Sequence, residues 1–170
     1  MSERIQYGWG ESSLGRFLVA TSEQGVVYLE FEDTHSVGRL RERFPDALLE
    51  EGGQVTSELA EALGRLVDHP ELGHEIALDL RGTDFQKAVW TMVREIPPGQ
   101  TTNYGALAAK LGTRDARDVT DAIASNSIAV LVPCHRVIKK DGSISGYRWG
   151  VRRKKALLER ERRLASDRPV

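Results

Sequence analysis

The sequence predicts an α/β protein of the α+β type, in which a small β-sheet domain with helices precedes a mostly helical domain. Short apolar, β-branched runs joined by turn residues fill the first half, whereas apolar residues recur at helical spacing in the second. The charge also changes sign between the halves. Residues 1–80 hold 6 Arg or Lys and 16 Asp or Glu, a net charge of −10, and residues 81–170 hold 18 and 9, a net charge of +9. The basic second half is therefore expected to meet a polyanion such as nucleic acid.

Length and composition exclude several classes of protein. A chain of 170 residues with 40% hydrophobic and 29% charged residues is typical of a soluble globular protein with one domain or two small ones. No apolar run approaches the ~20 residues needed to cross a bilayer, and residues 1–4 lack the basic and apolar regions of a signal peptide. The single cysteine excludes an internal disulfide framework and indicates a reducing compartment. We therefore expect a cytoplasmic protein with no membrane segment.

The first half is expected to form strands and helices that carry no chemistry. Its aromatic residues Trp9, Phe17 and Tyr28 are interpreted as packing residues rather than a binding surface. A boundary is predicted at Arg81-Gly82, which gives domains 1–81 and 82–170. The predicted elements are strands at 15–20 and 26–31 with a hairpin turn at 22–25, helices at 36–44 and 55–67, and a strand at 76–80.

The second half begins with a pattern typical of a helix start. Thr83 is followed three residues later by Gln86, which predicts a capping box at the first turn of a core helix. Two shorter helices are expected at 104–111 and 115–126, separated by a glycine-containing turn at 112–114. This arrangement indicates a helix-turn-helix, although many helical hairpins share it.

The C-terminal segment predicts a basic amphipathic helix that begins at Val151 and ends at about residue 165. Leu157 and Leu158 should form its buried stripe. Its cations, Lys154 among them, are expected outside.

The only cysteine lies in the most informative segment of the chain. Residues 130–132 are a short apolar run that predicts a buried strand, which Pro133 ends because it has no N–H to donate. Cys134 would then stand where a rigid element meets a turn, with His135 and Arg136 as its next neighbours. A thiol reacts as the thiolate, and nearby imidazole and guanidinium groups favour that form by lowering the thiol pKa. The pattern indicates a nucleophilic cysteine rather than a buried structural one.

Several motifs that extend over most of the chain carry a family resemblance. They are Tyr7-Gly8-Trp9-Gly10, residues 13–20, Gly82-Thr83-Asp84-Phe85-Gln86, Ile96-Pro97, Gly99-Gln100-Thr101, Asn126, Pro133-Cys134-His135-Arg136-Val137, Ser145-Gly146-Tyr147-Arg148-Trp149-Gly150, and Lys155-Ala156-Leu157-Leu158 with Glu161. On these motifs the chain resembles the O6-alkylguanine-DNA alkyltransferase family, in particular the C-terminal domain of bacterial Ada-type proteins. The resemblance implies a ribonuclease-H-like supporting domain at 1–81. It also implies a winged helix-turn-helix-like domain for DNA binding and alkyl transfer at 82–170.

The resemblance implies the chemistry as well. Duplex DNA with an O6-alkylguanine or O4-alkylthymine would be the partner, and the flipped base would give its alkyl (methyl) group to Cys134 in a single turnover. His135, oriented by Glu161, would take the thiol proton through a water, and Tyr104 would help to rotate the target phosphate. The residues implied to hold the base are Tyr147, Val137, Ser145, Trp149 and the hinge residue Asn126.

The same resemblance places DNA against helix 115–126. Arg117 would fill the gap that the flipped base leaves, since a planar cation recovers stacking. The other expected DNA contacts are Arg114, Thr101, Thr102 and Arg136. The chain has no glycine-rich nucleotide-binding pattern, and its histidines and cysteine lack zinc-ligand spacing. We therefore expect no cofactor, no metal and no dissociable methyl donor. The protein is also expected to be a monomer.

One departure from the family pattern concerns DNA affinity. Asp115, Asp118 and Asp121 follow a spacing of three and would share one helix face, where they would repel phosphate if that face met DNA. Two alternatives therefore stay open. One is a non-enzymatic alkyl-lesion-binding protein, or an Ada-like regulatory protein, of the same fold with weak repair activity. The other is a cysteine hydrolase or redox sensor that uses Cys134 and His135, which would leave the helix-turn-helix unexplained.

Overall fold

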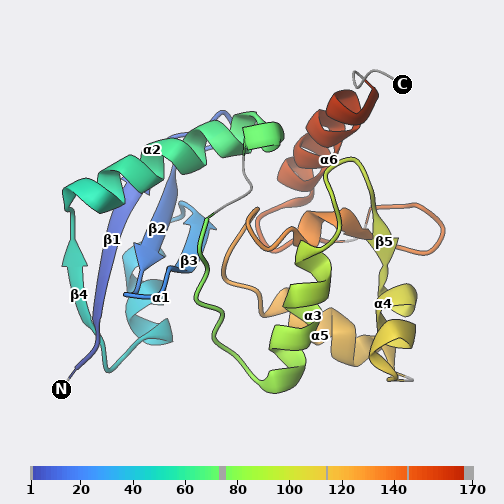
Figure 1. Ribbon diagram of the computed structural model, residues 1–170, viewed down its shortest axis with the longest axis horizontal. Helices are drawn as coiled ribbons and strands as arrows, with labels where there is room; N and C mark the ends of the chain where they lie inside the picture. Colours follow the sequence, from blue (N-terminus) through green and yellow to red (C-terminus); the bar gives the residue numbers. More distant parts are fainter. Residues whose placement is uncertain (1, 73–75, 114, 145, 167–170) are drawn as a thin grey trace. The chain divides into compact units, whose positions relative to one another are not determined.

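A computed structural model describes residues 2–72, 76–113, 115–144 and 146–166 (Figure 1). The chain divides into two compact units, Met1–Leu80 and Arg81–Val170. A four-stranded sheet with helices forms the first unit, and helices dominate the second. The predicted fold class is confirmed, whereas the ribonuclease-H-like character of the first unit stays a prediction. None of the helices within the described ranges is long and apolar enough to cross a membrane.

The sheet of the first unit has the strand order β3-β2-β1-β4. Strand β2 pairs antiparallel with both β1 and β3, and β4 pairs parallel with β1. The predicted hairpin between β2 and β3 is confirmed, and the Ser22 amide donates to the Gly25 carbonyl at 2.9 Å in its turn. The strands are β1 (Arg4–Gly10), β2 (Phe17–Thr21), β3 (Val26–Phe31) and β4 (Leu48–Glu51).

Helices α1 (Ser36–Arg43) and α2 (Gln54–Asp68) cover the two faces of this sheet, and the short η1 (Pro70–Leu72) follows α2 (Figure 1). Because side chains alternate along a strand, neighbouring residues of β2 face different helices. Leu18 belongs to the same buried cluster as Leu40 of α1. Phe17 instead lies against Gly64 of α2. Both helices were predicted, and the sequence pattern placed each within one residue of its observed ends.

The strand predicted at 76–80 is wrong, and strands β1 and β4 were not predicted. Only Leu78 pairs, in an isolated parallel bridge with Val26. The Asp79 carboxylate accepts a hydrogen bond from the Ser22 hydroxyl at 2.6 Å, so this segment is tied to the hairpin turn rather than running along the sheet edge. Strands β1 and β4 contain glycine or paired glutamates, which weaken a strand pattern in the sequence.

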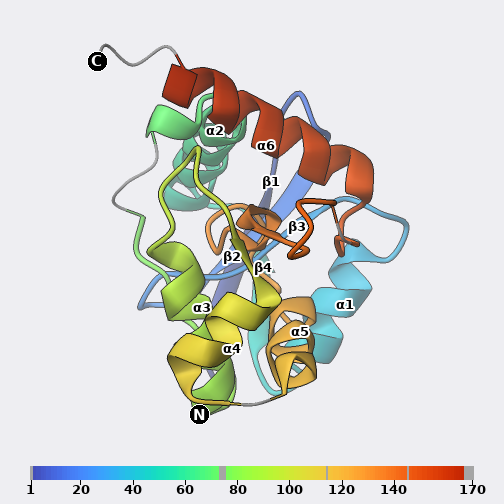
Figure 2. The same ribbon diagram turned by 90° about the vertical axis from the view of Figure 1, so that its right-hand side faces the viewer.

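In the second unit, helices α3 (Asp84–Arg94), α4 (Tyr104–Leu111) and α5 (Ala116–Ala124) lie together at one end, and helix α6 (Val151–Ser166) lies at the other (Figure 2). The predicted capping box is confirmed: Thr83 Oγ1 accepts from the Gln86 amide at 3.1 Å, and Gln86 Oε1 accepts from the Thr83 amide at 2.9 Å. The Trp90 indole donates to the Ala122 carbonyl at 2.8 Å and so joins α3 to α5. The elements are α3 (Asp84–Arg94), β5 (Thr102–Asn103), α4 (Tyr104–Leu111), α5 (Ala116–Ala124), η2 (Cys134–Arg136), β6 (Val137–Ile138) and α6 (Val151–Ser166).

The predicted strand at 130–132 is wrong, because this segment is a tight turn. Val130 has a φ of 68°, in the left-handed region that a β-branched residue rarely adopts. The Leu131 amide donates to the Ala129 carbonyl at 2.7 Å, and the Val132 amide donates to the Ile128 carbonyl at 3.2 Å. The apolar run is buried or half-buried in the turn, so hydrophobicity alone could not distinguish the turn from a strand.

Two further expectations about helix residues are corrected. The helix predicted at 115–126 ends earlier, because α5 stops at Ala124 and Ser125, with right-handed geometry, is its C-cap, so Asn126 lies beyond the helix. Lys154 of α6 was expected outside but is 1% exposed, and its ammonium donates to the Val137 carbonyl at 2.7 Å. Leu157 is buried as predicted, whereas Leu158 is only half-buried.

The capping box at the start of α3 predicts a measurable contribution to stability. Thr83→Ala removes the acceptor of the Gln86 amide and should lower the free energy of unfolding by about 1 kcal/mol. Thr83→Ser keeps a hydroxyl cap and should retain most of the stability. Chemical denaturation of the three proteins tests this, and equal midpoints for all of them would show that the cap contributes nothing.

Candidate active site

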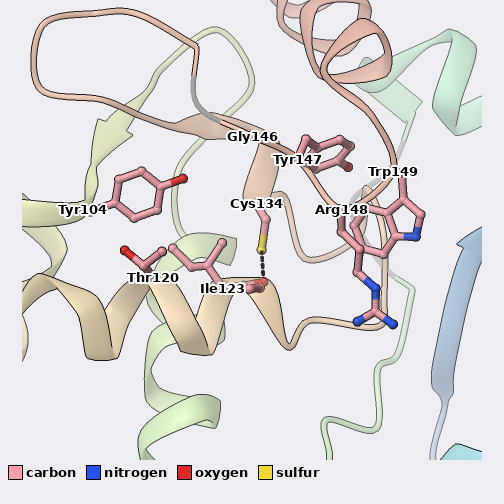
Figure 3. A pocket seen from close by; sticks show the side chains of 9 residues that line it. Tyr104, Thr120, Ile123, Cys134, Gly146, Tyr147, Arg148 and Trp149 are labelled. Atoms are coloured by element: carbon pink, nitrogen blue, oxygen red, sulfur yellow. Dashed lines mark hydrogen bonds between the residues drawn. The ribbon is translucent and has the colours of Figure 1, made fainter.

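A cavity of about 290 Å³ opens at Cys134 in the second unit (Figure 3). Helices α4 and α5 form one side of it, and the loop 146–149 forms the other. The cavity brings together four residues that the sequence had singled out, Tyr104, Cys134, Tyr147 and Trp149. The remaining lining residues are Thr120, Ile123, Ala124, Gly146 and Arg148. Of these, the sequence pattern could have indicated those on α5, because 120, 123 and 124 follow the spacing of one helix face.

Cys134 begins the short helix η2 and is buried. The Asn126 side-chain amide donates to Sγ at 3.2 Å, and Sγ lies 3.9 Å from the Ile123 carbonyl, to which it donates (Figure 3). Burial raises the pKa of the thiol to about 12, although the Asn126 hydrogen bond and the Lys154 charge both lower it. The expectation that His135 and Arg136 lower this pKa is wrong. Cys134 is therefore a thiol at neutral pH until a base removes its proton.

Asn126 holds the turn that precedes the cysteine. Its Oδ1 accepts from the Ile128 amide at 2.9 Å, and its Nδ2 donates to the carbonyls of Ile128 and Val132 at 3.3 and 3.2 Å. The same Nδ2 reaches Cys134 Sγ. One buried amide thus fixes both the turn and the thiol, and it connects them to the end of α5.

His135 and Arg136 both face Glu161 of α6. Nε2 of His135 lies 2.6 Å from Glu161 Oε1, and the Arg136 guanidinium donates to both carboxylate oxygens at 2.9–3.0 Å. Arg136 also donates to the Ile96 carbonyl, and its side chain is only 11% exposed. This placement does not fit the DNA contact predicted for Arg136, because its guanidinium is committed to groups inside the domain.

Burial and their neighbours set the protonation of His135 and Glu161. Burial lowers the pKa of His135 and outweighs the opposite effect of Glu161, so the imidazole is neutral near pH 7. Burial by itself raises the pKa of Glu161, but the bonds from His135 and Arg136 outweigh it and hold that pKa below its ordinary value of 4.5. A carboxylate beside Nε2 places the imidazole proton there, which leaves Nδ1 as the acceptor. Nδ1 is buried and has no hydrogen-bond partner among the described residues.

Tyr147 and Trp149 form the wall of the cavity opposite α5 (Figure 3). Their rings meet edge to face, with centroids 5.1 Å apart. The Tyr147 hydroxyl is buried without a hydrogen-bond partner in the described part of the chain, and burial raises its pKa well above the ordinary value. It therefore stays protonated and can donate to a ligand. Arg148 donates to the Asn126 carbonyl at 3.1 Å and ties this loop to the hinge position.

Three other residues predicted to hold the base or to contact DNA, Val137, Thr101 and Thr102, do not line the cavity. Val137 is fully buried at the start of β6, Thr102 is half-buried in β5 and Thr101 is exposed. Arg114 and Ser145 lie outside the described residues. Their predicted roles stay predictions.

Arg117 projects from the first turn of α5, with 89% of its side chain exposed. Asp115 is the N-cap of this helix and accepts from the Arg117 amide at 2.8 Å. Its carboxylate also pairs with the Arg117 guanidinium at 3.2 and 3.3 Å, and these bonds lower the pKa of Asp115. Asp115 thus differs from Asp118 and Asp121, which are exposed further along the helix.

Comparison with known proteins gives a consistent result. A family model described as "6-O-methylguanine DNA methyltransferase, DNA binding domain" matches residues 84–163. The bifunctional transcriptional activator/DNA repair enzyme Ada of Escherichia coli is 38% identical over 92% of this chain, but the chain spans only 45% of that relative's length. The inducible methylated-DNA–protein-cysteine methyltransferase of Bacillus subtilis is 35% identical, over 91% of this chain and 88% of the relative.

Solved structures agree with these relatives. The O6-methylguanine methyltransferase of Mycobacterium tuberculosis superposes with a TM-score of 0.80 at 34% identity, covering 98% of this chain and 96% of that one. The structure of Mycobacterium tuberculosis OGT in complex with DNA gives a TM-score of 0.77 at 34% identity, covering 93% of each chain.

The buried carboxylate predicts a specific loss of stability. Glu161→Gln leaves the cationic Arg136 without its buried counter-charge and should lower the free energy of unfolding at pH 7 by about 3 kcal/mol. The stability that the carboxylate contributes is present above its ordinary pKa of 4.5 and is lost as the pH falls through its lower folded pKa, so the difference should shrink in acid.

The matched control is Glu159→Gln, on the same helix two residues away, where the carboxylate pairs with Arg162 and Arg163 at the surface. This variant should behave as the wild type. Urea denaturation between pH 3 and 8 gives the free energy of unfolding of the wild type and of both variants. Equal losses for the two variants would contradict a buried ion pair at Glu161.

Proposed function

Because the chain belongs to the family of O6-alkylguanine-DNA alkyltransferases, the methylated-DNA–protein-cysteine methyltransferases, we propose that it repairs DNA by moving an alkyl group from the O6 of guanine, or the O4 of thymine, to Cys134. Double-stranded DNA that carries the lesion is the proposed partner. The observation that carries this proposal is that Cys134 lines a cavity together with the aromatic residues Tyr104, Tyr147 and Trp149, while the Asn126 amide holds its sulfur. Such cavities are typical of small-ligand sites.

The transfer is a single displacement. A lone pair of Sγ forms a bond to the alkyl carbon while the bond from that carbon to O6 breaks, and the electron pair of the broken bond goes to the base. The thiol proton is removed, and one proton is returned to the base, so the base leaves neutral. The protein keeps a thioether and acts once. The alkyl group arrives on the DNA, so the reaction needs no separate methyl donor.

The proton path in this proposal starts at His135. Its neutral ring has an acceptor at Nδ1, and Glu161 holds Nε2 and stabilises the imidazolium that forms when the proton arrives. Because the thiol pKa of about 12 lies far above neutral pH, proton removal is a real cost of the reaction. The contact between Arg136 and Glu161 fixes the carboxylate in place for this task.

The base is proposed to enter between α5 and the loop 146–149. A cavity of about 290 Å³ is small for a ligand site and suits one base with a small alkyl group. The Tyr147 hydroxyl, protonated and without a partner in the described residues, can donate a hydrogen bond to the departing base. A base inside a duplex cannot reach this cavity, so it has to be flipped, at a cost of a few kcal/mol. Arg117 and Tyr104 are the residues proposed to assist that step.

Intact-protein mass spectrometry tests the proposed transfer. Incubation with a duplex oligonucleotide that carries O6-methylguanine should add one methyl group, about 14 Da, to the wild type and nothing to Cys134→Ala. No gain with retained binding to the lesion would instead support a damage-recognition protein. If the protein neither gains mass nor binds the lesion, both functions are rejected.

The pair between Asp115 and Arg117 predicts the effect of one aspartate on DNA affinity. Asp115→Asn keeps a good N-cap but releases Arg117 and removes one negative charge, so it should tighten duplex binding by about threefold at low salt. Asp118→Asn and Asp121→Asn remove the same charge without releasing Arg117 and should change affinity less. Fluorescence anisotropy at two salt concentrations measures this. Equal effects of the three substitutions would show that the pair has no part in DNA binding.

A further inference from the structure

Lys154 is an unusual member of the basic helix α6. Its neighbours Arg152 and Lys155 are exposed, whereas Lys154 is 1% exposed. Burial of an ammonium is unfavourable, and here it lowers the lysine pKa from 10.5 to about 8. At neutral pH most of the population still carries the charge. A helix with several surface cations therefore keeps one charge inside the domain, where it costs stability.

The position of the ammonium connects it to the nucleophile. Nζ donates to the Val137 carbonyl at 2.7 Å, and the amide of the same Val137 donates to the Cys134 carbonyl at the end of η2. Lys154 and Cys134 are therefore joined through one hydrogen-bonded backbone residue. The Lys154 charge lowers the pKa of the Cys134 thiol, and a Cys134 thiolate in turn raises the pKa of Lys154. Each group therefore favours the charged form of the other.

The other charged and titratable groups near the thiol do not take this role. Arg136 is bound to Glu161, His135 is neutral, and a Tyr147 anion would oppose a thiolate. Tyr104 faces the cavity from α4, Arg148 from the loop 146–149, and Arg153 lies on α6, but none of these three contributes to the pKa shift of Cys134. The groups that favour the thiolate are the Asn126 amide, which is neutral, and Lys154, which is charged.

We propose that Lys154 is a positioning residue for alkyl transfer, whose buried ammonium stabilises the Cys134 thiolate and fixes the Val137 carbonyl at the end of η2. This inference deepens the proposed function and rests on it for the identity of the nucleophile. A carbonyl oxygen has two lone pairs, so Val137 can accept from Lys154 and keep one lone pair for another donor. The ammonium is placed without any need for DNA, so it acts in the free protein.

The effect can be measured with iodoacetamide, which needs neither DNA nor a lesion. Sγ forms a bond to the reagent's carbon, the carbon–iodine bond breaks, iodide leaves, and the thiol proton goes to solvent. The rate follows the thiolate population, which rises tenfold per pH unit below the thiol pKa. In the wild type this rise should flatten near pH 8, because Lys154 then loses the proton that stabilises the thiolate.

Lys154→Met keeps the length of the side chain and removes the charge. At pH 7 it should react about tenfold more slowly than the wild type, and the two rates should converge toward pH 10, where the wild-type lysine is neutral. Lys155→Met is the matched control, since it removes one exposed charge from the next position of the helix. It should reproduce the wild-type profile. A wild-type profile that rises without a break from pH 6.5 to 9.5 would overturn the proposal even if no variant folded.

Stability separates this role from a structural one. In the unfolded chain Lys154 binds its proton up to about pH 10.5, whereas in the folded protein it releases it near pH 8, so its contribution to stability rises with pH between these values. Lys154→Met should therefore fold at pH 7 without loss of stability. A variant that is destabilised and slower by the same factor at every pH would assign Lys154 to structure alone.

The result is independent of the repair test. If the wild type takes no methyl group from DNA, the proposed function fails, but the iodoacetamide profiles still decide whether Lys154 acts on the thiol. If methyl transfer occurs and the profiles of Lys154→Met and Lys155→Met coincide, the proposed function stands and the role of Lys154 falls.

Discussion

The Asn126 side-chain amide is the interaction on which the site depends. Its oxygen accepts from a backbone amide of the turn between α5 and η2, and its nitrogen donates to two carbonyls of that turn. The same side-chain nitrogen also donates to the Cys134 sulfur. A turn that holds Val130 at a φ of 68° needs such support, because a β-branched residue is strained there. The cysteine is placed by this turn rather than by a strand. The nucleophile and the helix proposed to meet DNA are therefore positioned by one buried group.

Burial of the site favours the neutral forms of its titratable side chains, which makes the charged thiolate costly to form. The same removal of water raises the pKa of Cys134, lowers that of His135 and keeps Tyr147 protonated. Such a site is stable in its neutral form and reacts only if charge can be formed inside it. Glu161, Arg136 and Lys154 are the buried charges that make this feasible, and each is held by hydrogen bonds to defined partners.

The charged side chains on the exposed side of α5 interact more weakly than the buried charges of the site. They are in water, where pair energies are small and salt screens them, so they can alter DNA affinity without altering the chemistry at Cys134. Asp115 combines two tasks, since it caps the helix and pairs with Arg117. The three aspartates that seemed equivalent by their spacing are therefore not equivalent in the structure.

The sequence by itself determined what depends on local order. The hairpin at residues 22–25, the capping box at Thr83 and the helices from α1 to α6 follow from turn chemistry, caps and helical spacing, and the motif around Cys134 indicated the nucleophile. Tertiary structure decided what depends on neighbours distant in the chain. The run at 130–132 became a turn because Asn126 bonds its backbone, Arg136 turned inward to Glu161, and Lys154 was buried against Val137. Hydrophobicity and charge describe a residue alone, whereas burial, hydrogen bonding and pKa are properties of the surroundings that folding brings together.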